Sequence, residues 1–467
     1  MSKSAKSPAP EGESFELYAR HQKIYPRKVT GLFATLRVLG VMVLLGLYYF
    51  VPWFQYDGHQ AVLFDLPARK FYVFGLVFWP QDFFYLALLL IIAALALFFF
   101  TTLAGRLWCG YACPQTVWTE VFLWIEQWLE GDRNKQIKLD KSPWTPRKIR
   151  IKAVKHLLWF LFAAWTGFTF VGYFTPITTL WDELMTFSLG PWETFWILFY
   201  GFATWGNAGF LREQVCIYMC PYARFQSAMF DRDTLIISYD EKRGEPRGPR
   251  RKGADPRELG LGDCVDCTLC VQVCPTGIDI RDGLQYQCIG CAACIDVCDQ
   301  VMEKMGYPPG LIRYTTENAV KGKPTRILRP RVIVYGLLLL SLTGLLFYSM
   351  ATRTPLRMDI IRDRNVLYQE TSEGLVENTY MVKIINMDEK PHTYRLGVDG
   401  IEGLQLVVRE REITAPSGKV ITLPVRVRVD PVNLNRTSSE IRFHLQAVDE
   451  PELSIVETGR FLGPMIH

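Results

Sequence analysis

The chain has 467 residues, of which 49% are hydrophobic and 21% are charged, and its net charge is +5. This length is too great for one compact domain and corresponds to about three units of roughly 150 residues. Because Lys and Arg gather beside long apolar runs, the small positive excess indicates membrane topology and speaks against nucleic-acid binding.

Residues 1–30 are polar and basic without an apolar core, which predicts a cytoplasmic N-terminal segment and no cleavable signal peptide. Five apolar runs are long enough to cross a bilayer core, which needs about 20 residues. These runs are approximately 31–51, 83–103, 157–175, 192–211 and 332–350. A shorter run, 71–80, ends in proline and is predicted to be interfacial or re-entrant.

The Lys and Arg residues of the loops predict the orientation of the spans. Residues 1–30 carry six and 104–153 carry nine, whereas 52–82 carry two and 176–191 carry none. The positive-inside rule therefore places the N-terminus, the 104–153 loop and the 212–331 segment in the cytoplasm. The residues from 351 onward are predicted to lie outside.

The motif C-x3-C-P occurs twice, each time directly after the second span of a predicted pair. Its four cysteines are Cys109, Cys113, Cys216 and Cys220. Because both copies share one topology, they are predicted to be related by an axis along the membrane normal, with both motifs on the cytoplasmic face. Soft, ionised sulfurs suit Cu(I), so the four are candidate catalytic residues of a copper site. A dithiol redox switch and simple packing of small buried side chains are the alternatives.

The proline of each motif is well placed as the first residue of a new helix. Cys113 and Cys220 are therefore predicted at helix N-caps, where the helix dipole favours the thiolate. Further positive charge is expected nearby from Arg106, Arg212 and Arg224. After the first motif, the sequence predicts an interfacial amphipathic helix.

A duplicated series C-x2-C-x2-C-x3-C predicts a bacterial-type ferredoxin domain with two [4Fe–4S] clusters, in which the fourth cysteine of each copy ligates the other cluster. One predicted ligand set is Cys264, Cys267, Cys270 and Cys298; the other is Cys288, Cys291, Cys294 and Cys274. A zinc ribbon is the alternative, but zinc needs only four ligands per site and does not explain the duplicated series. Gly277 and Gly290 suit tight loops, and Asp299 stands where a proline often follows the last cysteine. All 12 cysteines lie between Cys109 and Cys298, which excludes a secreted disulfide scaffold.

The remaining segments complete the expected organisation. Residues 241–260 are rich in Arg, Gly and Pro and predict a mobile linker, and about seven short strands near the C-terminus predict an immunoglobulin-like β-sandwich. The six histidines do not suffice for a bis-histidine membrane haem, and no dinucleotide fingerprint or P-loop occurs. The expected domains are an N-terminal segment (1–30), a four-span membrane domain (31–230), a basic linker (231–260), the ferredoxin domain (261–330), a fifth transmembrane helix (331–351) and the periplasmic sandwich (352–467).

With these motifs in this order, the chain resembles the FixG/CcoG family of cytochrome c oxidase accessory proteins. Its membrane half is also similar to NapH-type ferredoxin proteins, which share C-x3-C-P after paired spans. The resemblance implies a role in maturing a copper-containing cbb3-type oxidase in a bacterial inner membrane. Specifically, it implies the reduction of Cu(II) to Cu(I) for insertion.

Three functions are weighed. The leading hypothesis is a cupric reductase, in which a cytoplasmic donor supplies electrons to the clusters and copper is held by the four motif cysteines. The second is a quinol dehydrogenase-type electron relay, and the third is a non-enzymatic oxidase assembly scaffold. The expected partners are the membrane, a copper ion, the cytoplasmic donor and, through the periplasmic domain, assembly factors, with a homodimer as an option.

Overall fold

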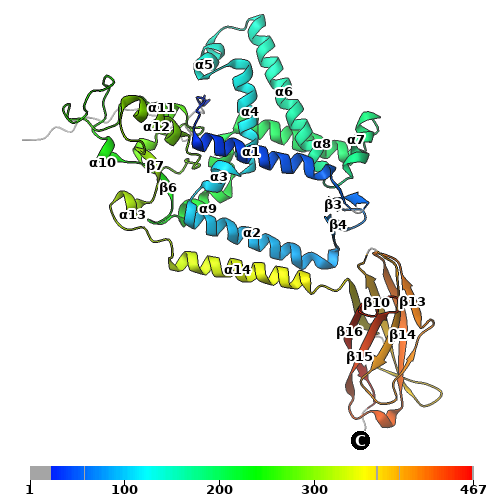
Figure 1. Ribbon diagram of the computed structural model, residues 1–467. Helices are drawn as coiled ribbons and strands as arrows, with labels where there is room; N and C mark the ends of the chain where they lie inside the picture. The colour runs from blue at the N-terminus through cyan, green and yellow to red at the C-terminus, as the bar shows by residue number, and fades with distance from the viewer. Residues whose placement is uncertain (1–22, 57, 364–365, 389, 465–467) are drawn as a thin grey trace, which may run out of the picture. The chain divides into compact units, whose positions relative to one another are not determined.

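A computed structural model describes residues 23–56, 58–363, 366–388 and 390–464 (Figure 1). The chain divides into two compact units. The first unit comprises Met1–Leu47, Leu97–Gly167 and Leu198–Val332, and the second comprises Tyr48–Ala96, Phe168–Ile197 and Ile333–His467. All 12 cysteines belong to the first unit.

In the part of the chain that the structure describes, four helices are long and apolar enough to cross a membrane. They are α1 (Leu32–Phe50), α2 (Phe83–Ala104), α6 (Pro146–Val171) and α14 (Pro330–Ala351). The remaining predicted span contains α8 (Pro191–Gly206), whose 16 residues fall short of the about 20 that a bilayer core needs. A π-helical segment, η3 (Asn207–Leu211), directly follows α8 and carries the helical path to the predicted end of that span.

The structure adds detail to two stretches of the sequence prediction. Helix α6 begins at Pro146, ahead of the predicted apolar run, and Lys152 and Lys155 in its basic first half pair with Glu130 of a neighbouring helix. The run 71–80, predicted to be interfacial or re-entrant, is too short to span and has a β-structure. It forms strands β4 (Lys70–Val73) and β5 (Leu76–Phe78), which make an antiparallel sheet with β3 (Val62–Asp65). Its aromatic and β-branched residues favour strands once a neighbouring strand satisfies their backbone.

The first unit also contains shorter helical segments. They are α3 (Leu107–Tyr111), α4 (Pro114–Glu130), α5 (Arg133–Lys141), the π-helical η4 (Val215–Met219), α9 (Pro221–Met229), α11 (Leu269–Gln272), α12 (Ala293–Met305) and α13 (Glu317–Val320). As predicted, Cys113 and Cys220 are the N-cap residues of α4 and α9, each followed by proline.

The predicted linker belongs to the folded ferredoxin region. It contains β6 (Ile236–Tyr239), which pairs antiparallel with β7 (Ile312–Thr315) from beyond the second cysteine series, and α10 (Glu241–Gly244). Its arginines have partners in this region: Arg243 forms an ion pair with Asp263 at 2.6 Å, and Arg250 donates to the Tyr307 hydroxyl at 2.9 Å. The segment is therefore held to the cysteine region and is not a free tether.

The second unit contains the β-sandwich. One sheet runs β12 (Gln405–Val407), β14 (Val420–Val429), β10 (Val376–Asn386) and β8 (Leu356–Arg362), with β9 (Gln369–Glu370) also paired to β10. The other runs β13 (Glu412–Ala415), β11 (His392–Asp399), β15 (Ser438–Ala447) and β16 (Ser454–Leu462). Val425, Val427 and Val429 of β14 point into the core, in agreement with their alternation with Arg426 and Arg428 in the sequence. The unit also holds α7 (Ile177–Met185), β1 (Gln55–Tyr56) and β2 (His59–Gln60).

Candidate redox site

The eight ferredoxin cysteines lie in two groups, each around its own cavity. Cys264, Cys267, Cys270 and Cys298 line one cavity and are called the first thiol set. Cys274, Cys288, Cys291 and Cys294 line the other, together with Cys270, and are called the second thiol set. The structure thus places the last cysteine of each series with the first three of the other, as the crossed arrangement requires.

The neighbours that shift the pKa of each thiol show the same grouping. Burial, with contributions from Cys270 and Cys264, raises the pKa of Cys298 to about 12. Burial likewise raises the pKa of Cys288 to about 12, with Cys291 and Cys274 contributing. Such thiols are neutral until a cation displaces their protons, so metal binding is coupled to proton release.

The backbone repeats the same unusual conformation in both series. The second cysteine of each series, Cys267 or Cys291, is flanked on both sides by residues with positive φ. These are Asp266 (50°) and Thr268 (56°) in the first series, and Gly290 (71°) and Ala292 (59°) in the second. Left-handed residues on both sides turn the chain sharply around the sulfur.

Asp299 departs from the expected turn. It lies within α12, and its carboxylate accepts a hydrogen bond from the backbone N–H of Gly310 at 2.7 Å. The helix therefore continues past Cys298, where a proline would have ended it.

The sulfur spacing distinguishes a cubane from a single zinc ion. Among the described residues, no three cysteine sulfurs lie within 4.8 Å of one another. A tetrahedral zinc ion with Zn–S bonds of about 2.3 Å would bring its sulfurs to about 3.8 Å. This spacing speaks against one zinc ion in either thiol set, and the grouping of the eight cysteines into two sets matches the ligands of two [4Fe–4S] clusters. When bound, these clusters supply one-electron transfer.

The two C-x3-C-P motifs come together in the first unit. Their four cysteines, Cys109, Cys113, Cys216 and Cys220, are called the motif quartet. Burial raises the pKa of Cys109 to about 12, with contributions from Cys113 and Cys216. Burial raises the pKa of Cys216 to about 12 as well, with contributions from Cys113 and Cys220. The sulfurs are thus mutual electrostatic neighbours, although the two motifs are far apart in the sequence.

The predicted thiolate at the N-cap of α4 is wrong. Burial raises the pKa of Cys113, and the backbone N–H groups of Gln115 and Thr116 offset this only in part. Arg212, which was expected to place positive charge near the sulfurs, instead forms an ion pair with Glu126 at 2.8 Å. The desolvation of the Cys113 thiol therefore raises its pKa by more than the backbone N–H groups at the start of α4 lower it. The positive charge that does lower the pKa of Cys109 and Cys216 is that of Arg106.

The segment that leads into the second motif is one residue longer than the segment that leads into the first. Arg106 precedes Cys109 by three positions, whereas Arg212 precedes Cys216 by four. The structure accommodates the longer segment with the π-helical turns η3 and η4, between which Arg212 has a positive φ of 44°. Such π-helical turns are often found at functional sites, and the sequence patterns did not reveal these two.

The first motif is packed directly against the loop of the second thiol set. A side chain at Gly110 would meet the carbonyl oxygen of Gly290 at 2.9 Å and the Cα of Cys291 at 3.0 Å. Arg106 donates from Nη1 to the carbonyl of Cys288 at 3.0 Å and to that of Tyr286. The quartet and the second thiol set are therefore neighbours.

Helix α1 is joined to the same region. Asp296 of α12 accepts hydrogen bonds from the backbone N–H groups of Phe33 at 3.2 Å and Ala34 at 2.7 Å, in the first turn of α1. A carboxylate in this position offsets the unpaired N–H groups and the dipole of the helix end. Arg37, one turn further along, donates to the carbonyl of Cys291 at 3.2 Å.

A cavity of about 610 Å³ extends between α1, α4 and the cysteine loops. Its wall includes apolar side chains such as Met42 and Trp124, the charged Glu120, and both Cys216 and Cys291. It therefore reaches a cysteine of the quartet and a cysteine of the second thiol set.

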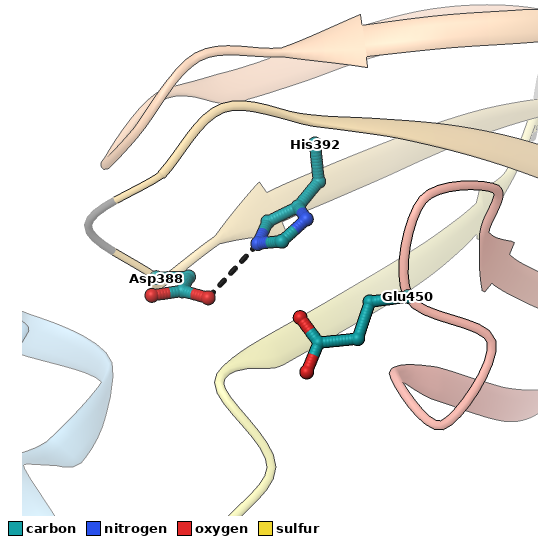
Figure 2. Close-up of side chains that lie close together, drawn as sticks. All are labelled: Asp388, His392 and Glu450. Carbon is teal, nitrogen blue, oxygen red and sulfur yellow. Dashed lines mark hydrogen bonds and ion pairs between the residues drawn. The ribbon is translucent and has the colours of Figure 1, made fainter.

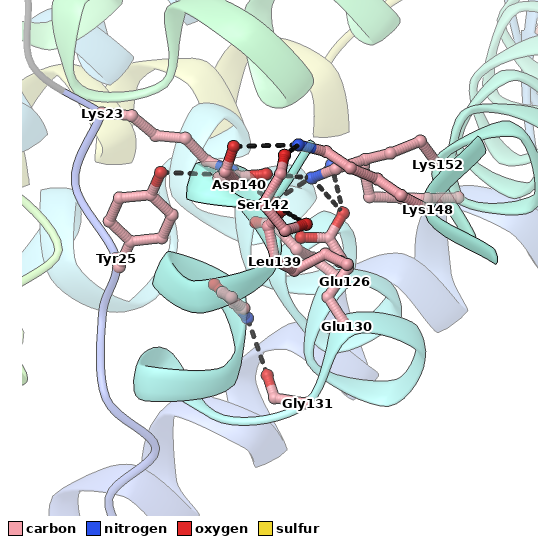
Figure 3. A network of polar contacts seen from close by, with 12 residues as sticks. Lys23, Tyr25, Glu126, Glu130, Gly131, Leu139, Asp140, Ser142, Lys148 and Lys152 are labelled. Atoms are coloured by element: carbon pink, nitrogen blue, oxygen red, sulfur yellow. Dashed lines mark hydrogen bonds and ion pairs between the residues drawn. The ribbon is translucent and has the colours of Figure 1, made fainter. Parts of the chain in front are cut away.

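A network of ion pairs surrounds Glu126 and Asp140 (Figure 3), and Arg212, which precedes the second motif, pairs with Glu126. Glu126 of α4, about 1% exposed, pairs with Arg212 at 2.8 Å, Lys23 at 3.0 Å and Lys155 at 3.3 Å. Burial alone would raise the pKa of Glu126, but Arg212, Lys23 and Lys155 lower it to about 2. Asp140 binds Lys23 and Lys152 in the same network.

Two cavities lined by cysteines, a C-terminal sandwich and several apolar helices define the class: a membrane-bound iron–sulfur protein of the ferredoxin type. Family models agree, since residues 211–317 match a 4Fe-4S dicluster domain and 86–136 match a 4Fe-4S binding domain. Residues 346–464 match the immunoglobulin-like fold at the C-terminus of FixG.

The sequence relatives then identify the family. Protein RdxB of Cereibacter sphaeroides is 40% identical, covering 90% of this chain and 91% of the relative. Nitrogen fixation protein FixG of Rhizobium meliloti is 39% identical, covering 91% and 88%. The chain belongs to the FixG family. A crystal structure of a FixG-related protein from Vibrio parahaemolyticus is 33% identical and covers 24% of this chain and 100% of its own, with a TM-score of 0.22.

Proposed function

We propose that this membrane iron–sulfur protein is a cupric reductase that supports assembly of a cbb3-type cytochrome c oxidase. The observation that carries the proposal is the packing of the first C-x3-C-P motif on the loop of the second thiol set. Four sulfurs suited to Cu(I) thereby lie beside the ligands of an electron carrier.

The proposed reaction is a one-electron step. Cu(II) gains one electron and becomes Cu(I), and a one-electron donor of the cytoplasm is oxidised. The quartet would hold the copper, and each coordinating thiol would release its proton. Soft sulfur ligands favour Cu(I) over Cu(II), so they favour the product. Arg106 would stabilise the thiolates of Cys109 and Cys216, whose pKa it lowers.

The proposed topology has five spans in the bacterial inner membrane. The distribution of Lys and Arg in the loops supports a cytoplasmic N-terminus and cytoplasmic thiol sets, and a periplasmic sandwich. The sandwich would contact oxidase assembly factors, because it carries none of the redox residues.

The test is the double variant Cys113→Ser with Cys220→Ser, assayed anaerobically for Cu(II) reduction. Serine retains the size of cysteine and is a good N-cap, so the fold should survive. We expect cupric turnover to be lost while dithionite still reduces the clusters, whose ligands lie elsewhere. A copper chelator control is needed, since free thiols reduce Cu(II) unaided. Undiminished turnover in a variant with full clusters would refute the copper site, and normal oxidase assembly in that case would favour the scaffold function.

The cavity of about 610 Å³ favours a second candidate, a quinol-oxidising relay. Its apolar wall at α1 suits a lipid-soluble donor, and it reaches Cys216 and Cys291. Reduced protein should be reoxidised by Cu(II) if the first proposal is right. Reduction of oxidised protein by a quinol analogue, lost in the double variant with no effect of copper, would support the relay instead.

A further inference from the structure

A histidine at one end of the sandwich is surrounded by carboxylates (Figure 2). His392 begins β11 and is only 3% exposed. Its Nδ1 lies 2.7 Å from an oxygen of Asp449, and its Nε2 lies 2.9 Å from an oxygen of Asp388. Glu450, from the turn between β15 and β16, points toward the same space.

The three groups that converge have the spacing of metal ligands. One ligand atom each from Asp388, His392 and Glu450 lies within 4.8 Å of the other two. An ion with bonds of about 2.1 Å joins donors up to about 4.2 Å apart. Glu450 is exposed, so its side chain is free to adjust to the bond length that an ion requires.

Asp449 lies at the other ring nitrogen of the imidazole. A metal-binding histidine usually gives its second ring N–H to a carboxylate, which fixes the tautomer and the direction of the ring. Here Asp449 would accept that hydrogen bond at Nδ1 and direct Nε2 toward Asp388 and Glu450.

The local charge also favours a cation. Three carboxylates surround one imidazole, and among the described residues no Lys or Arg lies within ion-pair distance of Asp449 or Glu450. His444, another histidine of the sandwich, has a different charge environment. It pairs with one carboxylate, that of Asp399, and Arg442 neutralises this carboxylate from a distance of 2.9 Å.

We propose that Asp388, His392 and Glu450 bind one divalent first-row transition-metal ion, with Asp449 as the positioning residue. One imidazole and two carboxylates suit ions from Mn²⁺ to Zn²⁺ and leave positions for water. The site lies in the second unit, apart from the cysteines, and is independent of the proposed cupric reduction.

The experiment is equilibrium dialysis of the full-length protein in detergent against Mn²⁺, with bound manganese measured by elemental analysis. Mn²⁺ is chosen because thiolates bind it poorly, so the cysteines should not compete. The variants are His392→Gln and Glu450→Gln, with His444→Gln as the matched control. We expect wild type and control to bind about one Mn²⁺ more than either site variant, and Zn²⁺ to displace it.

Asp449→Asn should weaken Mn²⁺ binding by about 10- to 100-fold without abolishing it. Because Glu450 is exposed, its substitution should leave the sandwich folded, and circular dichroism checks this. Equal manganese binding by wild type and Glu450→Gln would overturn the proposal and leave His392 as the centre of an ion-pair cluster.

Discussion

Arg106 donates a hydrogen bond to the carbonyl of Cys288 at 3.0 Å, which joins the first C-x3-C-P motif to the loop of the second thiol set. Its Nη2 also donates to the carbonyl of Ala223 in α9 at 2.9 Å, after the second motif. No carboxylate of the described residues forms an ion pair with Arg106, so its charge acts on the nearby sulfurs. One side chain thus holds three segments of the chain together.

Arg106→Lys keeps the charge but cannot reach three carbonyls from one planar group. We expect it to lower the free energy of unfolding of the first unit by about 2 kcal/mol, as lost hydrogen bonds of a charged donor imply. Thermal unfolding checks this. Arg331→Lys is the control, because exposed Arg331 makes a single hydrogen bond to Met229. Equal effects of the two substitutions would contradict a special role for Arg106.

Gly110→Ala should disrupt the packing of the motif on the second thiol set. The new Cβ would meet only backbone atoms, at 2.9–3.0 Å, which cannot move aside cheaply. We expect a destabilisation of about 1–3 kcal/mol and loss of iron from the second thiol set, measured by thermal unfolding and iron analysis. Gly46→Ala in α1 is the matched control, since nothing lies within 4 Å of its Cβ. Full iron content in Gly110→Ala would show that the two sites are not coupled by this contact.

The wild-type protein should contain about eight irons and eight acid-labile sulfides, as two cubanes require. Among serine variants, Cys274→Ser and Cys288→Ser should leave the same residual electron paramagnetic resonance spectrum. Cys264→Ser and Cys298→Ser should share the other spectrum. An uncrossed arrangement would instead pair Cys274→Ser with Cys264→Ser. Stoichiometric zinc with little iron would refute the cluster assignment, and about twelve irons would indicate a further cluster at the quartet.

Glu126→Gln should destabilise the first unit by about 3 kcal/mol at neutral pH, because three cations lose their buried partner. The folded pKa of about 2 lies below the usual 4.5, so the carboxylate's contribution is complete above about pH 4.5. It is lost as the pH falls toward 2. The difference in thermal midpoint between wild type and variant should therefore shrink as the pH is lowered from 6 to 3, and a constant difference would argue against this pKa.

Deletion of residues 356–467 should leave the iron content unchanged, because both thiol sets lie in the first unit. The cut follows Arg353, which pairs with Asp82 at 2.6 Å and keeps that partner. Oxidase assembly should fall if the sandwich contacts assembly factors, and oxidase activity in membranes measures this. Loss of iron would mean that the two units depend on each other for folding.

Local patterns in the sequence predicted much of the architecture. The proline after Cys113 and Cys220 located two helix starts, and alternation in β14 located its buried face. Features that depend on distant partners were not predictable. The basic first half of α6 pairs with Glu126, Glu130 and Asp140 from other helices, which no local pattern reveals. The neutral thiol of Cys113 results from burial that no spacing reveals.

The crossed grouping of the ferredoxin cysteines also bears on the biosynthesis of the protein. Cys298 is the last of the 12 cysteines, yet it completes the set begun by Cys264. Neither set of four thiols exists until the ribosome has translated both series. By then the helices from α1 to α8 have been synthesised, and the N–H groups of α1 that Asp296 binds are already available. Iron insertion must therefore come late in translation or after it, once most of the membrane part has been made.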